Sequence, residues 1–160
     1  MIGNPENKKV LVAGLGNPLM GDEGIGNYLI TKFEALSERW PLVEFLDVGT
    51  GGMSLLHIIA GWPKVIFIDC AFMKCEPGTI KRFTPDHVQS VKKLAHKSLH
   101  EADILKVTEL SAQLQQSHQE IVFFGIEPEI VEQKQELSKS LSAKTDHYID
   151  TICREIEISV

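Results

Sequence analysis

The chain has 160 residues, 43% of them hydrophobic and 24% charged, which is the composition of one globular domain spanning residues 1–160. No apolar run approaches the ~20 residues that cross a bilayer, and the polar N-terminus lacks the apolar core of a signal peptide, so we expect a cytoplasmic protein with no membrane partner. The formal net charge of −6, with no run of Lys or Arg, argues against nucleic acid as a partner.

Apolar runs in the first half of the chain alternate between strand-like and helix-like patterns. They predict strands at residues 10–13 and 43–48 and helices at about residues 24–36 and 53–59. The first predicted strand ends at Gly14, and apolar residues of the first predicted helix recur at spacings of three and four.

The second half continues the same alternation. It predicts strands at residues 65–68, 78–83 and 121–124 and helices at residues 102–114 and 138–156. The run at 65–68 is apolar at every position, as in a strand covered on both faces, whereas 78–83 is shorter and more polar, as at a sheet edge. The pattern predicts an α/β fold: a three-layer α/β/α sandwich around a mostly parallel, five-stranded twisted sheet, with one antiparallel edge strand.

Ligands of such sheets bind beyond the carboxyl ends of the strands, and several polar residues follow the predicted strands. Asp22 and Glu23 close the glycine-rich segment after the first strand, and Asp69 directly follows the third. His96 and His100 precede the helix predicted at 102–114. We expect carboxylates and at least one imidazole to meet at one edge, a donor set that suits a divalent transition metal.

Each of these residues also has a plain structural interpretation. An acid at a helix N-terminus complements the helix dipole, and a single histidine in a loop is commonly solvated. An aspartate that closes a buried strand needs a partner, because burying an unpaired charge is costly. The convergence of these residues on one edge therefore favours a site more than any one of them does.

Two other kinds of chemistry fit the sequence poorly. The Gly-x-Gly at residues 14–16 is typical of dinucleotide binding, but Leu19 replaces the third glycine and Asp47 lies 31 residues past Gly16, not ~20. No G-x-S-x-G segment is present. Cys70, one of three cysteines that we expect to be reduced thiols, is a nucleophile candidate only by its adjacency to Asp69.

Five segments together resemble the nickel–iron hydrogenase maturation endopeptidases, in the order of that family. They are GLGNPLMGDEGIG (14–26), DVGTGGMSLL (47–56), VIFIDCAFMKCEPGTI (65–80), SLHEADIL (98–105) and FFGIEPEIVE (123–132). The resemblance implies that the metal-binding and catalytic residues are Glu23, Asp69 and His100. It leaves Asp22 as a substitute for Glu23, and His96 as a competitor of His100.

The same resemblance assigns Gly49, Thr50 and Gly51 to a loop that faces the substrate. It implies an aspartic-type protease that removes the C-terminal extension of a hydrogenase large-subunit precursor after nickel insertion. The nickel would come with the precursor, and no permanent organic cofactor is expected. The metal would polarise the scissile carbonyl or activate water, with a carboxylate as base.

Two alternatives accompany this interpretation. Peptidyl-tRNA hydrolases carry a similar GLGNP segment, but their catalytic histidine follows within a short Arg-His-Asn stretch and their surfaces are basic. Here residues 19–28 contain no histidine, and the chain is acidic. The second alternative is a chaperone-like module on the same fold that binds the metal and releases no peptide.

Overall fold

The computed structural model describes residues 7–50, 54–85 and 119–160, and their centre is a single sheet in the order β2-β1-β3-β5-β4. The strands are β1 (Val10–Gly14), β2 (Val43–Asp47), β3 (Lys64–Cys70), β4 (Ile80–Phe83) and β5 (Glu120–Ile126). The first four in sheet order run parallel, and β4 pairs antiparallel with β5 at the edge. The predicted sheet, including its polar antiparallel edge strand, is confirmed.

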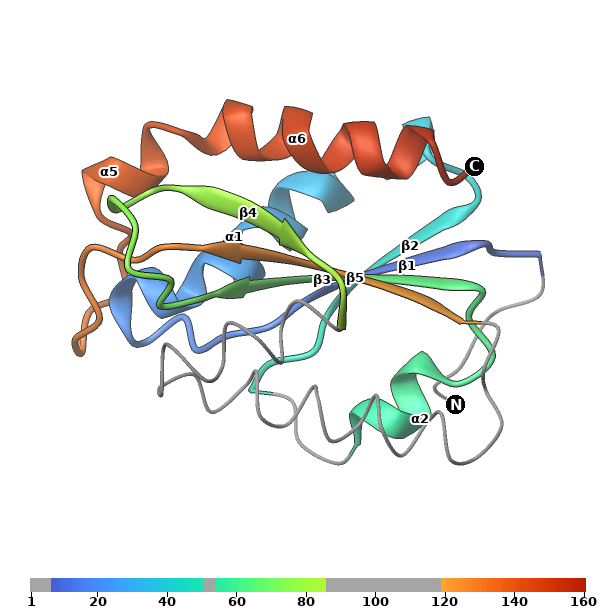
Figure 1. Ribbon diagram of the computed structural model, residues 1–160, viewed down its shortest axis with the longest axis horizontal. Coiled ribbons are helices and arrows are strands. Elements are labelled where there is room, and N and C mark those ends of the chain that lie inside the picture. The colour runs from blue at the N-terminus through green and yellow to red at the C-terminus, as the bar shows by residue number, and fades with distance from the viewer. Residues whose placement is uncertain (1–6, 51–53, 86–118) are drawn as a thin grey trace.

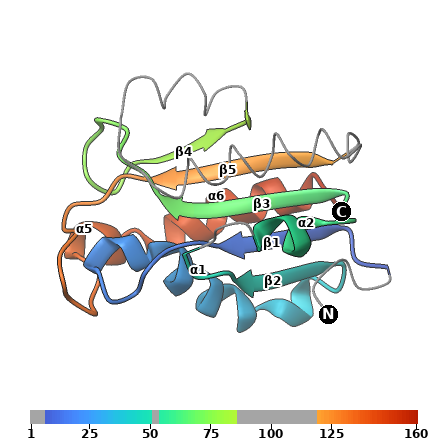
Figure 2. The same ribbon diagram turned by 90° about the horizontal axis from the view of Figure 1, so that it is seen from below.

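Helices lie on both faces of this sheet (Figure 1). Their bounds are 3-10 turns η1 (Gly21–Gly24) and η2 (Ser37–Arg39) and helices α1 (Ile25–Glu34), α2 (Leu55–Ile59), α5 (Lys139–Ser142) and α6 (Thr145–Glu157). The helices α1 and α6 cover one face and α2 the other, as the turned view also shows (Figure 2). This is the predicted three-layer arrangement; the helix predicted at 102–114 lies outside the described residues.

The strand β3 explains how apolar residues fill both layers. All seven of its residues are buried. Ile66 and Ile68 pack in the core under α1 and α6, whereas Val65 and Phe67 belong to the core under α2. Because side chains alternate along a strand, Asp69 falls on the α2 side of the sheet. None of the described helices has the length and apolarity needed to cross a membrane.

Two predicted boundaries were wrong. Asp69 does not follow the third strand but lies within β3, because β5 extends the pairing through Asp69–Gly125 and Cys70–Ile126. The helix predicted at 138–156 is divided into α5 and α6. The division lies where the backbone of Gly78 packs against Ser140 and Lys144, so a contact with a distant loop marks the joint.

An ionic network connects helix α6 to the amino end of β3 and to β4. Glu155 is buried and accepts hydrogen bonds from Lys64 Nζ at 3.0 Å and from Arg82 Nη2 at 2.8 Å. Burial acts to raise the pKa of the Glu155 carboxyl, but the hydrogen bonds from Arg82 and Lys64 outweigh burial and hold the pKa below its usual 4.5. The folded state therefore favours the ionised carboxylate.

This network predicts a specific loss of stability in acid. The unfolded carboxyl binds a proton at a higher pH than the folded one, so its stabilisation is present above about pH 4.5 and is lost as the pH falls through the lower folded pKa. Glu155→Gln should lower the free energy of unfolding at pH 7 by about 3 kcal/mol, because Lys64 is left buried without its main partner. Urea denaturation at pH values from 3 to 7 should also show that the free energy of unfolding falls less steeply in acid for Glu155→Gln than for the unmodified protein. An equally steep fall would contradict this account.

Candidate functional site

The glycine-rich segment at residues 14–26, here called the glycine loop, passes closely over the carboxyl end of the sheet. A Cβ at Gly26 would collide with the carbonyl oxygens of Leu15 and Ile68, so the first turn of α1 rests directly on the end of β3. Gly16 has φ +142°, a conformation that favours glycine, and its backbone lies against the carbonyl of Glu23. These close approaches place η1, which carries Glu23, beside the end of the strand that carries Asp69.

Asp22 fastens this loop to the segment that follows β5. The Asp22 side chain is fully buried, and its two oxygens accept four hydrogen bonds from residues more than 100 positions away. The donors are the backbone N–H groups of Glu129, Ile130 and Ser138 and the Ser138 hydroxyl, at 2.7–2.9 Å. These bonds occupy both oxygens, which gives Asp22 a structural role and argues against its replacing Glu23 as a metal ligand.

Carboxylates gather around Cys70, at the end of β3. Burial raises the pKa of the Cys70 thiol far above its ordinary value, and the charges of Asp69, Glu23, Asp22 and Glu127 raise it further, in that order. The contact of the glycine loop with the end of β3 puts Glu23 and Asp69 at the same end of the sheet, and their joint role in a site stays a prediction. Cys70 is buried, and burial disfavours its thiolate, so it is a packed core residue and a poor nucleophile.

Glu127 is a member of this group that sequence reasoning did not single out. It directly follows β5, is buried, and accepts hydrogen bonds from the backbone N–H groups of Met73 at 2.8 Å and Cys75 at 2.9 Å. It thereby holds the turn between β3 and β4. The sequence did indicate Glu127, because an acid directly after a buried strand is the pattern that drew attention to Asp69.

The loop after β2 is connected to the glycine loop. Asp47 Oδ1 accepts hydrogen bonds from Asn27 Nδ2 at 2.8 Å and from the Gly49 N–H at 3.0 Å, and the Gly49 carbonyl accepts from the Gly16 N–H at 2.8 Å. Gly49 has φ +59°, and a Cβ added there would meet no other described residue within 4 Å. Thr50 is exposed, and Gly51 lies outside the described residues.

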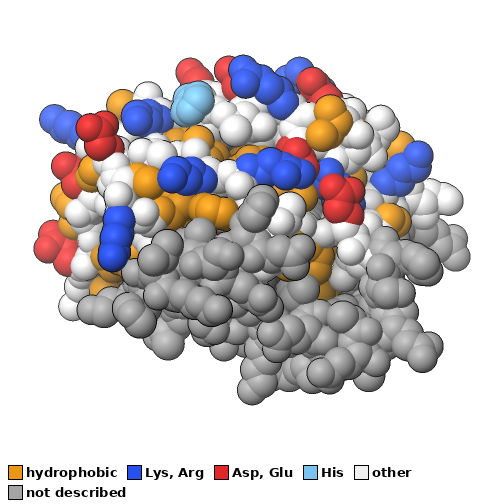
Figure 3. Space-filling model, in the orientation of Figure 1, with side chains coloured by type: hydrophobic (Ala, Val, Ile, Leu, Met, Phe, Trp, Pro, Cys, Tyr) orange, Lys and Arg blue, Asp and Glu red, His pale blue; other side chains and the backbone are white. Residues whose placement is uncertain are grey.

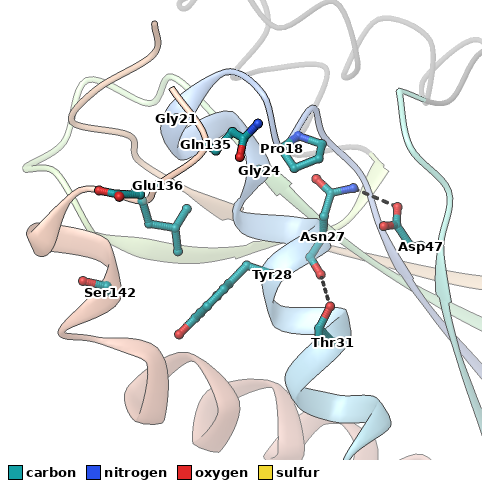
Figure 4. Close-up of a pocket in the computed structure, with 11 residues that line it drawn as sticks. Pro18, Gly21, Gly24, Asn27, Tyr28, Thr31, Asp47, Gln135, Glu136 and Ser142 are labelled. Atoms are coloured by element: carbon teal, nitrogen blue, oxygen red, sulfur yellow. Dashed lines mark hydrogen bonds between the residues drawn. The ribbon is translucent and has the colours of Figure 1, made fainter. Parts of the chain in front are cut away.

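A cleft of about 490 Å³ opens on the α1 side of the sheet (Figure 4). Its lining residues are Pro18, Gly21, Gly24, Asn27, Tyr28, Thr31, Asp47, Gln135, Glu136, Leu137 and Ser142. Tyr28 extends from α1 toward the side on which Ser142 lies. Neither Glu23 nor Asp69 lines the cleft, so the cleft and the carboxylate pair are separate features that share the η1 backbone.

His96 and His100 lie outside the described residues, so the imidazole ligand stays a prediction. Within residues 7–50, 54–85 and 119–160, no group of three or more His, Cys, Asp or Glu side chains could hold a metal ion. The described residues thus include two carboxylates, those of Glu23 and Asp69, at the carboxyl end of the sheet. On the face shown in Figure 3, basic and acidic side chains are interspersed and form no basic patch.

The Asp22 contacts predict a large structural effect from a small change. Asp22→Asn should lower the free energy of unfolding by roughly 3–5 kcal/mol, because both oxygens accept from backbone N–H groups and the amide nitrogen that replaces either of them cannot accept. Glu129→Ala removes an exposed acid of the segment that follows β5. This change should alter the free energy of unfolding by less than about 0.5 kcal/mol. Urea titrations of both variants at pH 7 measure this. Equal stability of Asp22→Asn and the unmodified protein would contradict the structural role.

Comparison with known proteins places this chain in a family. The family model described as hydrogenase maturation protease matches residues 28–155. The chain is 31% identical over 131 residues to the hydrogenase expression/formation protein HupD of Thiocapsa roseopersicina, covering 80% of this chain and 57% of HupD. It is 29% identical over 150 residues to the hydrogenase 2 maturation protease of Escherichia coli, covering 90% of this chain and 88% of that protein. The chain thus spans little more than half of the HupD length but most of the E. coli protein.

Solved structures show the same relationship. The hydrogenase-maturating endopeptidase HybD of E. coli has a TM-score of 0.79 and 29% identity, covering 94% of this chain and 93% of HybD. The HybD maturation protease of Thermococcus kodakarensis has a TM-score of 0.75 and 25% identity, covering 92% and 99%. The match of the family model over most of the chain, together with these folds, means that the chain belongs to the hydrogenase maturation protease family.

Proposed function

We propose that this protein is an endopeptidase that removes the C-terminal extension of a nickel–iron hydrogenase large-subunit precursor. The observation that supports it best is the contact of the glycine loop with the end of β3, which brings Glu23 and Asp69 to the carboxyl end of the sheet in a chain of the maturation protease family. The cleaved segment would approach this edge, where the glycine loop and the loop after β2 lie side by side.

The two carboxylates would recognise nickel already inserted in the precursor. Carboxylate and imidazole groups suit a divalent transition metal, and His100 is the proposed imidazole donor, with His96 as its rival. The nickel belongs to the substrate, so no permanent organic cofactor is proposed. Bound to these residues, the metal would polarise the scissile carbonyl or activate water.

Acid chemistry at this edge has a physical basis in the structure. Asp69 is 5% exposed, and its Oδ1 accepts a hydrogen bond from the Cys70 N–H at 2.8 Å, which fixes the orientation of the carboxylate. Glu23 is half-buried in a 3-10 turn whose backbone is held on both sides by Gly16 and Asp22. A carboxylate fixed in this way can hold a water or a metal without first losing rotamer entropy. Glu23 and Asp69 would both bind the metal, and a carboxylate that is not bound to it would act as the base.

The rival functions are less consistent with these features. A peptidyl-tRNA hydrolase needs a basic surface, whereas the face in Figure 3 has mixed charge and the chain carries a net charge of −6. A metal-carrying chaperone would use the same carboxylates but would leave the precursor intact. Only a cleavage assay separates it from a protease.

The test is an in vitro processing assay with the purified full chain and the nickel-loaded large-subunit precursors encoded in the same organism. Intact-mass measurement should show one precursor losing a defined C-terminal peptide. Glu23→Ala, Asp69→Ala and His100→Ala should each lower the rate by roughly a hundredfold or more, because each removes a group that acts on the reacting centre. His96→Ala should process normally.

Folding and identity controls accompany this assay. Circular dichroism should be the same for all four variants, so that lost activity reports the site and not the fold. Glu129→Ala, an exposed acid on the neighbouring loop, is the matched charge control and should retain full activity. Unaltered precursor with the unmodified protein would refute the proposal in favour of a binding module, and an active His100→Ala with an inactive His96→Ala would reassign the imidazole.

A further inference from the structure

Apolar side chains are exposed beside Glu23, where a soluble protein has no structural need for them. Among the described residues, five large hydrophobic side chains are exposed: Leu19, Phe72, Val131, Ile158 and Val160. Two of these lie at the C-terminus. The other three follow β1, β3 and β5, adjacent parallel strands whose carboxyl ends meet at the edge that carries Glu23 and Asp69. Exposure of large apolar groups is thus concentrated at the candidate site.

Two of these loops combine into one surface, here called the apolar rim, made of Pro18, Leu19, Met20, Ile130 and Val131. Leu19 is 56% exposed and Val131 37% exposed, Pro18 is exposed, and Met20 and Ile130 are half-buried. Residues 17–21 carry no charged side chain. Glu23 follows only two residues after this uncharged stretch.

Backbone hydrogen bonds hold the two loops side by side. Gly21 N–H donates to the Lys134 carbonyl at 2.6 Å, Lys134 N–H to the Leu19 carbonyl at 2.9 Å, and Asp22 N–H to the Ile130 carbonyl at 2.8 Å. A Cβ at Gly21 would lie only 2.7 Å from the Ile130 carbonyl oxygen, so the second loop wraps this glycine. The backbones of the two loops are held in this way, and Leu19 and Val131 are exposed on them.

We propose that the apolar rim binds apolar side chains of the precursor polypeptide next to the bond that is cleaved. This inference rests on the proposed function and deepens it by naming a substrate contact. Leu19 and its neighbours in the rim lie on the same loop as Glu23, so a chain held at Glu23 would pass beside them. The nearby carboxylates attract a metal at long range, whereas the uncharged rim adds short-range burial of apolar surface.

The size of the rim favours a substrate over a second copy of this chain. A stable protein–protein interface uses ~20–30 residues on each side, far more than the five of the rim. A contact of this size fits a partner that binds briefly and leaves after cleavage. Fixing both loops in advance lowers the ordering cost of such a weak contact.

The experiment measures KM and kcat for precursor processing by the full chain and its variants. Leu19→Ser should raise KM about tenfold, Leu19→Ser with Val131→Ser should raise it further, and kcat should stay within about twofold. Leu19→Met, which keeps an apolar side chain, should restore the KM of the unmodified protein. Ile158→Ser, at a side chain that is 76% exposed and distant in the fold from this edge, is the matched control and should have no effect.

Several outcomes would overturn the inference. Unchanged KM in the double variant would show that the rim does not contact the precursor, and an equal rise in Ile158→Ser would show a nonspecific effect. A dimer of the unmodified protein that Leu19→Ser dissociates in size-exclusion chromatography would assign the rim to self-association. Absence of any processing by the unmodified protein would instead refute the proposed function, and this inference with it.

Discussion

The geometry of the candidate site depends on one buried carboxylate. Asp22 accepts four hydrogen bonds from the segment after β5, and this contact fixes the glycine loop on top of the sheet. Burial of a charge is costly unless hydrogen bonds compensate for it, and here the protein supplies them from backbone groups and one hydroxyl. The adjacent Glu23 therefore sits in a turn whose position is set by contacts of its neighbour, which separates the structural acid from the one proposed to do chemistry.

The parallel sheet completes this arrangement. β1, β3 and β5 are neighbours and run in the same direction, so Glu23, Asp69 and Glu127 reach one edge from three distant stretches of the chain. Glu127 shapes the turn after β3, while Asp69 is held by the Cys70 N–H. The proposed chemistry uses the two carboxylates, and the proposed substrate contact uses the apolar rim on the same loops. Recognition and reaction would thus share one rigid support.

Much of the fold could be predicted from the sequence, because the uniformly apolar run at residues 65–68 of β3 and the polar β4 reflect burial directly. The functions of the adjacent acids could not. Asp22 and Glu23 look alike in the sequence, and the burial of Asp22 and its contacts with residues more than 100 positions away distinguish them. The division between α5 and α6 likewise lies where the chain packs against the distant Gly78. The predicted roles of His100, His96 and Gly51 fall outside the described residues and stay predictions, as does the substrate role of Gly49 and Thr50.

The most direct test of the carboxylate pair is a calorimetric titration of the purified protein with Ni²⁺ and with Cd²⁺. The account predicts one site per chain, lost in both Glu23→Ala and Asp69→Ala and kept in Asp22→Asn under conditions where that variant is folded. A site of unchanged affinity in Glu23→Ala or Asp69→Ala would contradict the central claim that these two side chains act together on a metal.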